Sequence, residues 1–91
     1  MREVRYHRNA ARYMRRMPAD RKEQIKAAVA ELAGLENLMQ HPSIKPMSGD
    51  WPGCVRLRIG SYRAIIRPMD DEQGTRLEVL QVGPRGDVYK S

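Results

Sequence analysis

The sequence predicts an α+β fold, in which a helical hairpin packs on one face of an antiparallel-rich sheet and the elements follow in the order β-α-α-β-β-β. Apolar residues recur at helical spacing through residues 10–33, and from residue 55 the apolar period changes to two. A short alternating segment precedes both helices. With 91 residues the chain has the length of one small domain, so we expect a single domain over residues 1–91.

The first two elements are expected to be a strand and a helix. Val4 and Tyr6 alternate with charged residues over residues 2–7, which predicts the strand. Asn9 is the expected N-cap of the helix, and Pro18 is its expected end. The apolar face of this helix has the spacing i, i+3, i+4, i+7 and consists of Ala10, Tyr13, Met14 and Met17.

A second helix is expected up to Gly34. Asp20 and Glu23 have the spacing of a capping box at its start. Its apolar positions repeat the helical period at Ile25, Ala28, Val29 and Leu32. Proline and glycine then recur through residues 35–53, which predicts a loop that can begin with one more helical turn.

A β-hairpin and a further strand are expected after this loop. Apolar residues alternate with arginine over residues 55–59, and residues 62–67 form the returning strand. Between them, Gly60-Ser61 places glycine at the first central position, as a type II′ turn requires. Residues 70–75 are predicted to be a polar turn and residues 77–82 the last strand.

The two-residue turn predicts the register of the hairpin, with Ile59 opposite Tyr62 and Arg58 opposite Arg63. One face then carries the apolar side chains that the helices should cover, namely Val55, Leu57, Ile59, Tyr62, Ala64 and Ile66. The other face carries three arginines and a fourth near its edge, namely Arg56, Arg58, Arg63 and Arg67.

These arginines are expected to lie close together. Arg56 and Arg58 are about 7 Å apart along the strand, and the Cβ atoms of Arg58 and Arg63 are roughly 5 Å apart across it. No acidic residue occurs within residues 55–67 to offset the charge. A single arginine on a sheet face is usually just solvated, but three together favour an anion site, because a guanidinium binds phosphate bidentately. Arg85 can add to this site from the last turn.

The composition also indicates a polyanionic partner. Lys and Arg number 17 against 11 Asp and Glu, the net charge is +6, and 13 of the 17 cations are arginine. One cysteine and two histidines supply neither a disulfide framework nor a ligand set, so we expect no metal and no cofactor. Cys54 is expected to be a small apolar filler, and Trp51 is expected to pack over the sheet edge. We find no signal peptide or membrane span and expect a cytoplasmic protein.

Residues 53–66, GCVRLRIGSYRAII, resemble the RelE/ParE superfamily of type II toxins, RelE branch. The resemblance continues in residues 82–89, VGPRGDVY, and in the loop at residues 45–49, KPMSG. Together with the preceding helical pair, it covers nearly the whole chain.

The resemblance implies a RelE-like fold and a ribosome-dependent mRNA endonuclease that cuts the codon in the A site of the 70S ribosome. A cognate antitoxin, a small acidic protein, would silence it. The RNA's own 2′-hydroxyl would attack the adjacent phosphate without a metal. By position, the family's catalytic residues correspond to Arg56, Arg58, Arg63, Arg85 and Tyr89. Contacts with RNA or the ribosome are expected from Arg12, Arg15, Arg16, Lys22, Lys26, Lys45 and Arg67.

Two departures leave the general base open. RelE itself has lysine at the positions of Arg56 and Arg58, and an arginine stays protonated where a lysine can exchange its proton. The segment between Arg85 and Tyr89 is also shorter than in RelE. Two alternatives remain: a ParE-like toxin that blocks DNA gyrase by binding, whose branch generally lacks this basic and tyrosine set, and an inactive relative that binds only its antitoxin.

Overall fold

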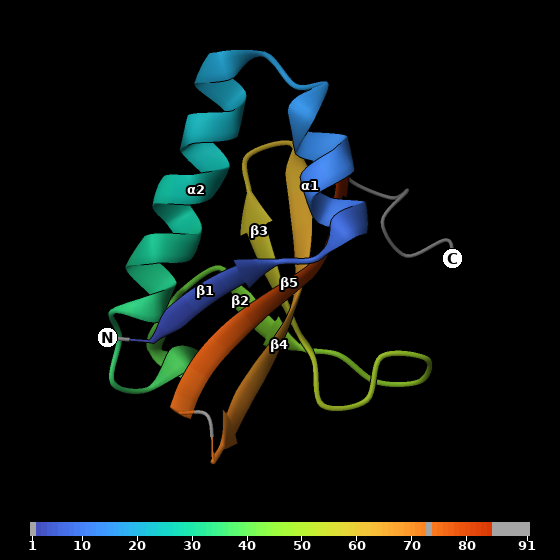
Figure 1. Cartoon of the computed structure of the whole chain (residues 1–91). Coiled ribbons are helices and arrows are strands. Elements are labelled where there is room, and N and C mark those ends of the chain that lie inside the picture. The colour runs from blue at the N-terminus through green and yellow to red at the C-terminus, as the bar shows by residue number, and fades with distance from the viewer. Residues whose placement is uncertain (1, 73, 85–91) are drawn as a thin grey trace.

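A computed structural model describes residues 2–72 and 74–84, which form a five-stranded sheet with two helices packed on one face (Figure 1). The predicted α+β class and element order are confirmed, with one additional strand. In chain order the elements are β1 (Glu3–Tyr6), α1 (Arg8–Arg15), α2 (Ala19–Ala33), a 3₁₀ turn η1 (Leu38–Gln40), β2 (Ile44–Pro46), β3 (Val55–Ile59), β4 (Tyr62–Asp71) and β5 (Gly74–Pro84).

The strands lie in the order β1-β5-β4-β3-β2. β1 is parallel to β5, and the other neighbours are antiparallel. The first and last strands of the chain are therefore side by side, as Figure 1 shows for β1 and β5. No helix within the described ranges is both long and apolar enough to cross a membrane.

The core lies between the two helices and the sheet. Ile25, Val29 and Leu32 of α2 are fully buried against the sheet face that carries Leu57 and Ile66. Fully burying a side chain such as Leu57 contributes about 1.5–3 kcal/mol. The predicted apolar face of the hairpin is confirmed, because all six of its residues belong to this cluster or pack against it.

The predicted hairpin register is confirmed. Arg58 pairs with Arg63, and Ile59 pairs with Tyr62. Gly60 has a φ of 58°, and no non-glycine residue in the described ranges has a positive φ, so Ser61 does not share it. This combination fits the type II′ turn, whose twist matches that of the two strands.

The predicted helix caps are wrong at both helices. α1 begins at Arg8 after His7, not after Asn9, because the backbone N–H of His7 still bonds to the Val79 carbonyl of the sheet, at 2.9 Å. The chain passes directly from β1 into the helix. α2 begins after Pro18, whose carbonyl accepts the Lys22 N–H at 3.0 Å, and no side chain caps it.

The expected capping box of α2 is therefore absent. Asp20 instead lies in the first turn of the helix, where the positive end of the helix dipole stabilises a carboxylate. The first helix also ends earlier than predicted, at Arg15 with Arg16 as its C-cap.

The strand boundaries depart from the prediction at three places. Residues 44–46 lie within the predicted loop but form β2, which pairs only with β3 at the sheet edge, where its last residue, Pro46, is tolerated. β4 and β5 extend through the predicted polar turn, so that Asp70 pairs with Thr75. β5 also continues to Pro84, beyond its predicted end.

The β4–β5 pairing shifts its register between Ile65 and Ile66. Ile65 pairs with Gln81 and Ile66 pairs with Val79, so Leu80 is an extra residue on β5. This shift returns Val82, three residues after Val79, to the helix-covered face.

The turn glycine supplies a test of the register. Gly60→Ala should lower the free energy of unfolding by about 1–2 kcal/mol, because its positive φ is strained for a residue with a Cβ. Space is not limiting, since the nearest atom to such a Cβ is Gln24 Nε2 at 3.6 Å. Urea denaturation measures the change.

Gly34→Ala is the matched control. Gly34 has a φ of −84°, and a Cβ there would lie 3.6 Å from the Glu31 carbonyl oxygen, an ordinary contact. This variant should be unchanged or more stable by up to about 1 kcal/mol. Equal losses in both variants would contradict the type II′ assignment.

Candidate functional site

The sheet face without helices carries five cationic side chains on β2, β3 and β4, and four of them form two directly opposed pairs, whereas Arg67 lies opposite Glu78. Lys45 lies directly opposite Arg56, and Arg58 lies directly opposite Arg63. Their strand neighbours Ile44, Leu57 and Ala64 point into the helix-covered core, so the cations project from the other face. We call Lys45, Arg56, Arg58 and Arg63 the cationic cluster.

The members of the cluster differ in burial. The Arg63 residue is only 7% exposed, and its Nη1 donates to the Tyr62 carbonyl oxygen at 3.2 Å. Arg56 is partly buried, whereas Arg58 and Lys45 are exposed. Neither Arg58 nor Arg63 forms an ion pair with a carboxylate of residues 2–72 or 74–84. Within the described residues, no carboxylate therefore neutralises either charge.

The cluster has the geometry of a phosphate site. Directly opposed side chains have Cβ atoms about 5 Å apart, and successive residues on one face are about 7 Å apart. Guanidinium groups at this spacing can hold two oxygens of one phosphate, or two phosphates in succession. Among residues 2–72 and 74–84, no group of three or more His, Cys, Asp or Glu side chains is placed to hold a metal ion.

A small apolar patch borders the cluster on the same face. Cys54 and Ile65 are buried there, and Met47, Trp51 and Leu80 pack against them. The loop after β2 folds back to form this patch, because the Met47 N–H bonds to the Cys54 carbonyl at 3.0 Å. Cys54 is the predicted buried filler. Trp51 packs against the sheet, but beside Ile65 of the central strand β4 and not over the sheet edge as predicted.

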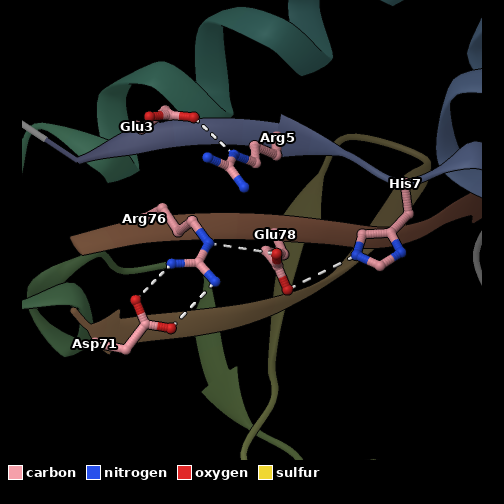
Figure 2. A network of polar contacts seen from close by, with 6 residues as sticks. All are labelled: Glu3, Arg5, His7, Asp71, Arg76 and Glu78. Atoms are coloured by element: carbon pink, nitrogen blue, oxygen red, sulfur yellow. Dashed lines mark hydrogen bonds and ion pairs between the residues drawn. The ribbon is translucent and has the colours of Figure 1, made fainter. Parts of the chain in front are cut away.

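A network of charged residues lies over β1, β5 and the end of β4 (Figure 2). Arg76, only 7% exposed, donates to both carboxylate oxygens of Asp71, at 2.9 and 3.2 Å, and to Glu78 at 3.4 Å. Hydrogen bonding to Asp71 raises the pKa of Arg76 above its usual value. Glu78 lies 3.7 Å from His7, and Arg5 bonds Glu3 at 2.7 Å. Figure 2 shows these side chains in one group.

This network is not predicted from the sequence. The acidic run at residues 70–72 has the composition of a solvated turn, but Asp71 bonds Arg76, and Asp70 accepts from Thr75 Oγ1 at 3.2 Å. The sequence does contain one signal for it. Each of the paired strands β1 and β5 carries a glutamate and an arginine two residues apart, namely Glu3 with Arg5 and Arg76 with Glu78. The network keeps carboxylates beside β1 and β5, away from the cationic cluster.

The cations predicted to contact RNA or the ribosome fall into three places. Lys45 belongs to the cluster, and Arg67 is exposed opposite Glu78. The helical ones lie on the other layer of the molecule, where Arg12 and Arg16 are exposed. A groove of about 220 Å³ has Arg15, Lys22 and Lys26 on its walls, together with Tyr6, Ala11 and Met14. Burial raises the pKa of the Tyr6 phenol.

Two predicted site residues, Arg85 and Tyr89, lie outside the described residues. Gly83, two residues before Arg85 in sequence, lies directly opposite Arg63 in the β4–β5 pairing. The structure thus brings together Arg56, Arg58 and Arg63, and it adds Lys45 to them from a strand that was not predicted.

Comparison with known families gives a match over residues 4–89 to the ParE toxin of the type II toxin–antitoxin system parDE. The chain belongs to this family. It is a toxin of the RelE/ParE superfamily of type II toxin–antitoxin systems, which confirms the superfamily resemblance. Comparison with curated protein sequences gives no significant match.

Solved structures of RelE toxins are similar to this ParE-family chain. The toxin–antitoxin complex RelBE2 from Mycobacterium tuberculosis contains a chain with 28% identity and a TM-score of 0.60, covering 92% of this chain and 98% of that one. An archaeal RelE–RelB complex from Pyrococcus horikoshii matches with 18% identity and a TM-score of 0.70, over 93% and 96% of the two chains. The fold is therefore RelE-like, as expected.

Because Arg58 and Arg63 lie directly opposite each other, we expect their repulsion to lower the free energy of unfolding. Like charges directly opposite on a sheet repel, so Arg58→Glu should raise the free energy of unfolding by about 0.2–1 kcal/mol, and high salt should diminish the gain. Urea denaturation at low and high salt measures it.

Arg67→Glu is the matched control on the neighbouring strand. Arg67 lies opposite Glu78, so the same substitution there creates a like-charge pair and should lower stability by a similar amount. Destabilisation by Arg58→Glu would contradict the repulsion within the cluster.

Proposed function

We propose that this toxin is a metal-independent endoribonuclease that cleaves mRNA in the ribosomal A site. The observation that carries the proposal is the cationic cluster, in which Arg58 and Arg63 face each other without a carboxylate partner among the described residues. An anion bound between the two guanidiniums would offset their repulsion. A backbone phosphate of RNA is that anion in this proposal.

The reaction uses the nucleophile of its own substrate. The 2′-oxygen of the nucleotide before the cut forms a bond to phosphorus as its proton leaves to solvent water. The bond from phosphorus to the 5′-oxygen then breaks, which gives a 2′,3′-cyclic phosphate and a 5′-hydroxyl. Negative charge builds on the phosphoryl oxygens, where fixed donors in a partly buried site stabilise it most.

The arginines differ in their proposed roles. Arg63 is held by its buried position and by the Tyr62 carbonyl, so it acts as the preorganised donor to the reacting phosphate. Arg56 and the exposed Arg58 bind the same or the adjacent phosphate. Arg85 and Tyr89 complete the proposed site, with Arg85 as a further phosphate donor and Tyr89 stacking on a base or assisting proton transfer.

We further propose two macromolecular partners. Related RelE toxins from Mycobacterium tuberculosis, Pyrococcus horikoshii and E. coli were crystallised with RelB antitoxins. We propose that a small acidic antitoxin binds this chain likewise. The net charge of +6 on the chain favours an acidic partner. The second partner is the 70S ribosome, whose RNA the helical cations Arg12, Arg15, Arg16, Lys22 and Lys26 would contact.

One observation favours a second candidate, because the matching family is that of ParE. In this alternative the chain blocks DNA gyrase by binding and cleaves no RNA. The two functions predict different effects of the cationic cluster: cleavage requires it at the reacting phosphate, whereas gyrase binding has no such requirement.

Primer extension on cellular mRNA after induction tests the proposal. The wild type should give cuts in phase with codons, and Arg63→Ala should reduce them about 100-fold or more, the usual loss for one such donor. Arg58→Ala should do likewise, and because Arg58 is exposed, this variant keeps the fold. Arg5→Ala, which removes an exposed cation bonded to Glu3 on the same face, is the control and should cut like the wild type.

Other outcomes overturn the proposal. DNA damage without codon-phased cuts would establish the gyrase alternative. Normal growth under full expression, with no cuts, would indicate an inactive relative that binds only its antitoxin.

A further inference from the structure

The proposed cleavage needs a proton for the departing 5′-oxygen. An arginine is a poor source, because its guanidinium keeps its proton at all ordinary pH values. The structure places one different cation in the cluster, Lys45. This lysine comes from β2, the strand that the sequence did not predict.

The position of Lys45 follows from the β2–β3 pairing. Lys45 lies opposite Arg56, and the Arg58 N–H bonds to the Ser43 carbonyl at 3.0 Å, so β2 runs beside β3 along the whole cluster. Ile44 is buried in the helix-side core, which directs Lys45 to the opposite face. Its Cβ is about 5 Å from that of Arg56.

The pairing also shows which other groups share this part of the face. The row through Lys45 continues with Arg56, Ile65 and Gln81, and the next row contains Ser43, Arg58, Arg63 and Gly83. On these two rows, Lys45 has the one ionisable side chain that is not a guanidinium. The carboxylate of Glu78 lies in the network with Arg76 and His7 instead.

We propose that Lys45 is the general acid of the cleavage reaction. The inference rests on the proposed function and names the proton donor of that site. A primary ammonium can give up a proton and take it back, which a guanidinium does not do. A flexible side chain on an edge strand can reach a phosphate bound between Arg56 and Arg58.

The proton balance of the step is complete. As the bond from phosphorus to the 5′-oxygen breaks, its electron pair stays on that oxygen. The oxygen takes a proton from the Lys45 ammonium and becomes the 5′-hydroxyl. The neutral amine is then reprotonated by solvent water.

A sulfur substitution at the leaving group tests this role. The substrate is mRNA on a ribosome with an empty A site, in which sulfur replaces the bridging 5′-oxygen at the mapped cut. A thiolate leaves without a proton, so this RNA bypasses the general acid. With the oxygen substrate, Lys45→Arg should lower kcat by 10²–10⁴-fold, the usual range for a lost general acid. It should leave ribosome binding unchanged, because the positive charge remains.

With saturating sulfur substrate, Lys45→Arg and Lys45→Ala should both cut with a kcat within a few-fold of the wild type. Arg58→Ala should stay slow on both substrates, since its loss is one of phosphate binding. Equal urea midpoints for the wild type and the Lys45 variants establish that folding is intact.

Three results would overturn the inference, and one of them reaches further. If Lys45→Arg cuts the oxygen substrate as fast as the wild type, Lys45 donates no proton. If the Lys45 variants stay slow on the sulfur substrate, Lys45 positions the phosphate and is not the acid. If the wild type cuts neither substrate, the proposed endoribonuclease function fails, and the role of Lys45 fails with it.

Discussion

The register of the β3–β4 hairpin is the constraint on which both the core and the cationic cluster depend. Gly60 and Ser61 set it, and alternation then sends Leu57 into the core and Arg58 to the opposite face. A slip by one residue would bury the arginines under the helices and expose the apolar side chains. The same turn therefore determines folding and assembles the site, and no separate element is needed to bring the arginines together.

The two halves of the helix-free face differ in whether their buried arginine has carboxylate partners. Beside β1 and β5, Arg76 is buried but bonded to two carboxylates, as a buried charge requires. On β3 and β4, Arg63 is as little exposed as Arg76, yet its Nη1 donates to a neutral carbonyl. The proposed phosphate site therefore has a cost in the isolated protein, which a bound anion would offset.

Elements with strong local patterns could be predicted from the sequence, whereas those fixed by tertiary pairing could not. The alternation over residues 55–66 with a Gly-Ser turn predicted the hairpin pairs residue by residue. β2 has only three residues and ends at Pro46, so it lacks a local signal and exists because β3 supplies its hydrogen bonds. The caps failed for the same reason, since the bond from His7 to Val79 of the sheet sets the start of α1. Lys45 entered the site only with that unpredicted strand.

The distribution of cations over both layers bears on the target. RelE-like folds are compatible with different activities, so the fold does not choose between RNA and gyrase. The cationic cluster lies on the helix-free face, while Arg12, Arg15, Arg16 and Lys26 are exposed on the helical layer. A single strand of nucleic acid lying along one face reaches only one of these surfaces. A crevice lined by RNA contacts both surfaces, because it surrounds the protein. Close contact matters because salt screens charges that are more than about 10 Å apart. The proposed ribosomal target would use both surfaces, with the cluster toward the mRNA and the helices toward ribosomal RNA.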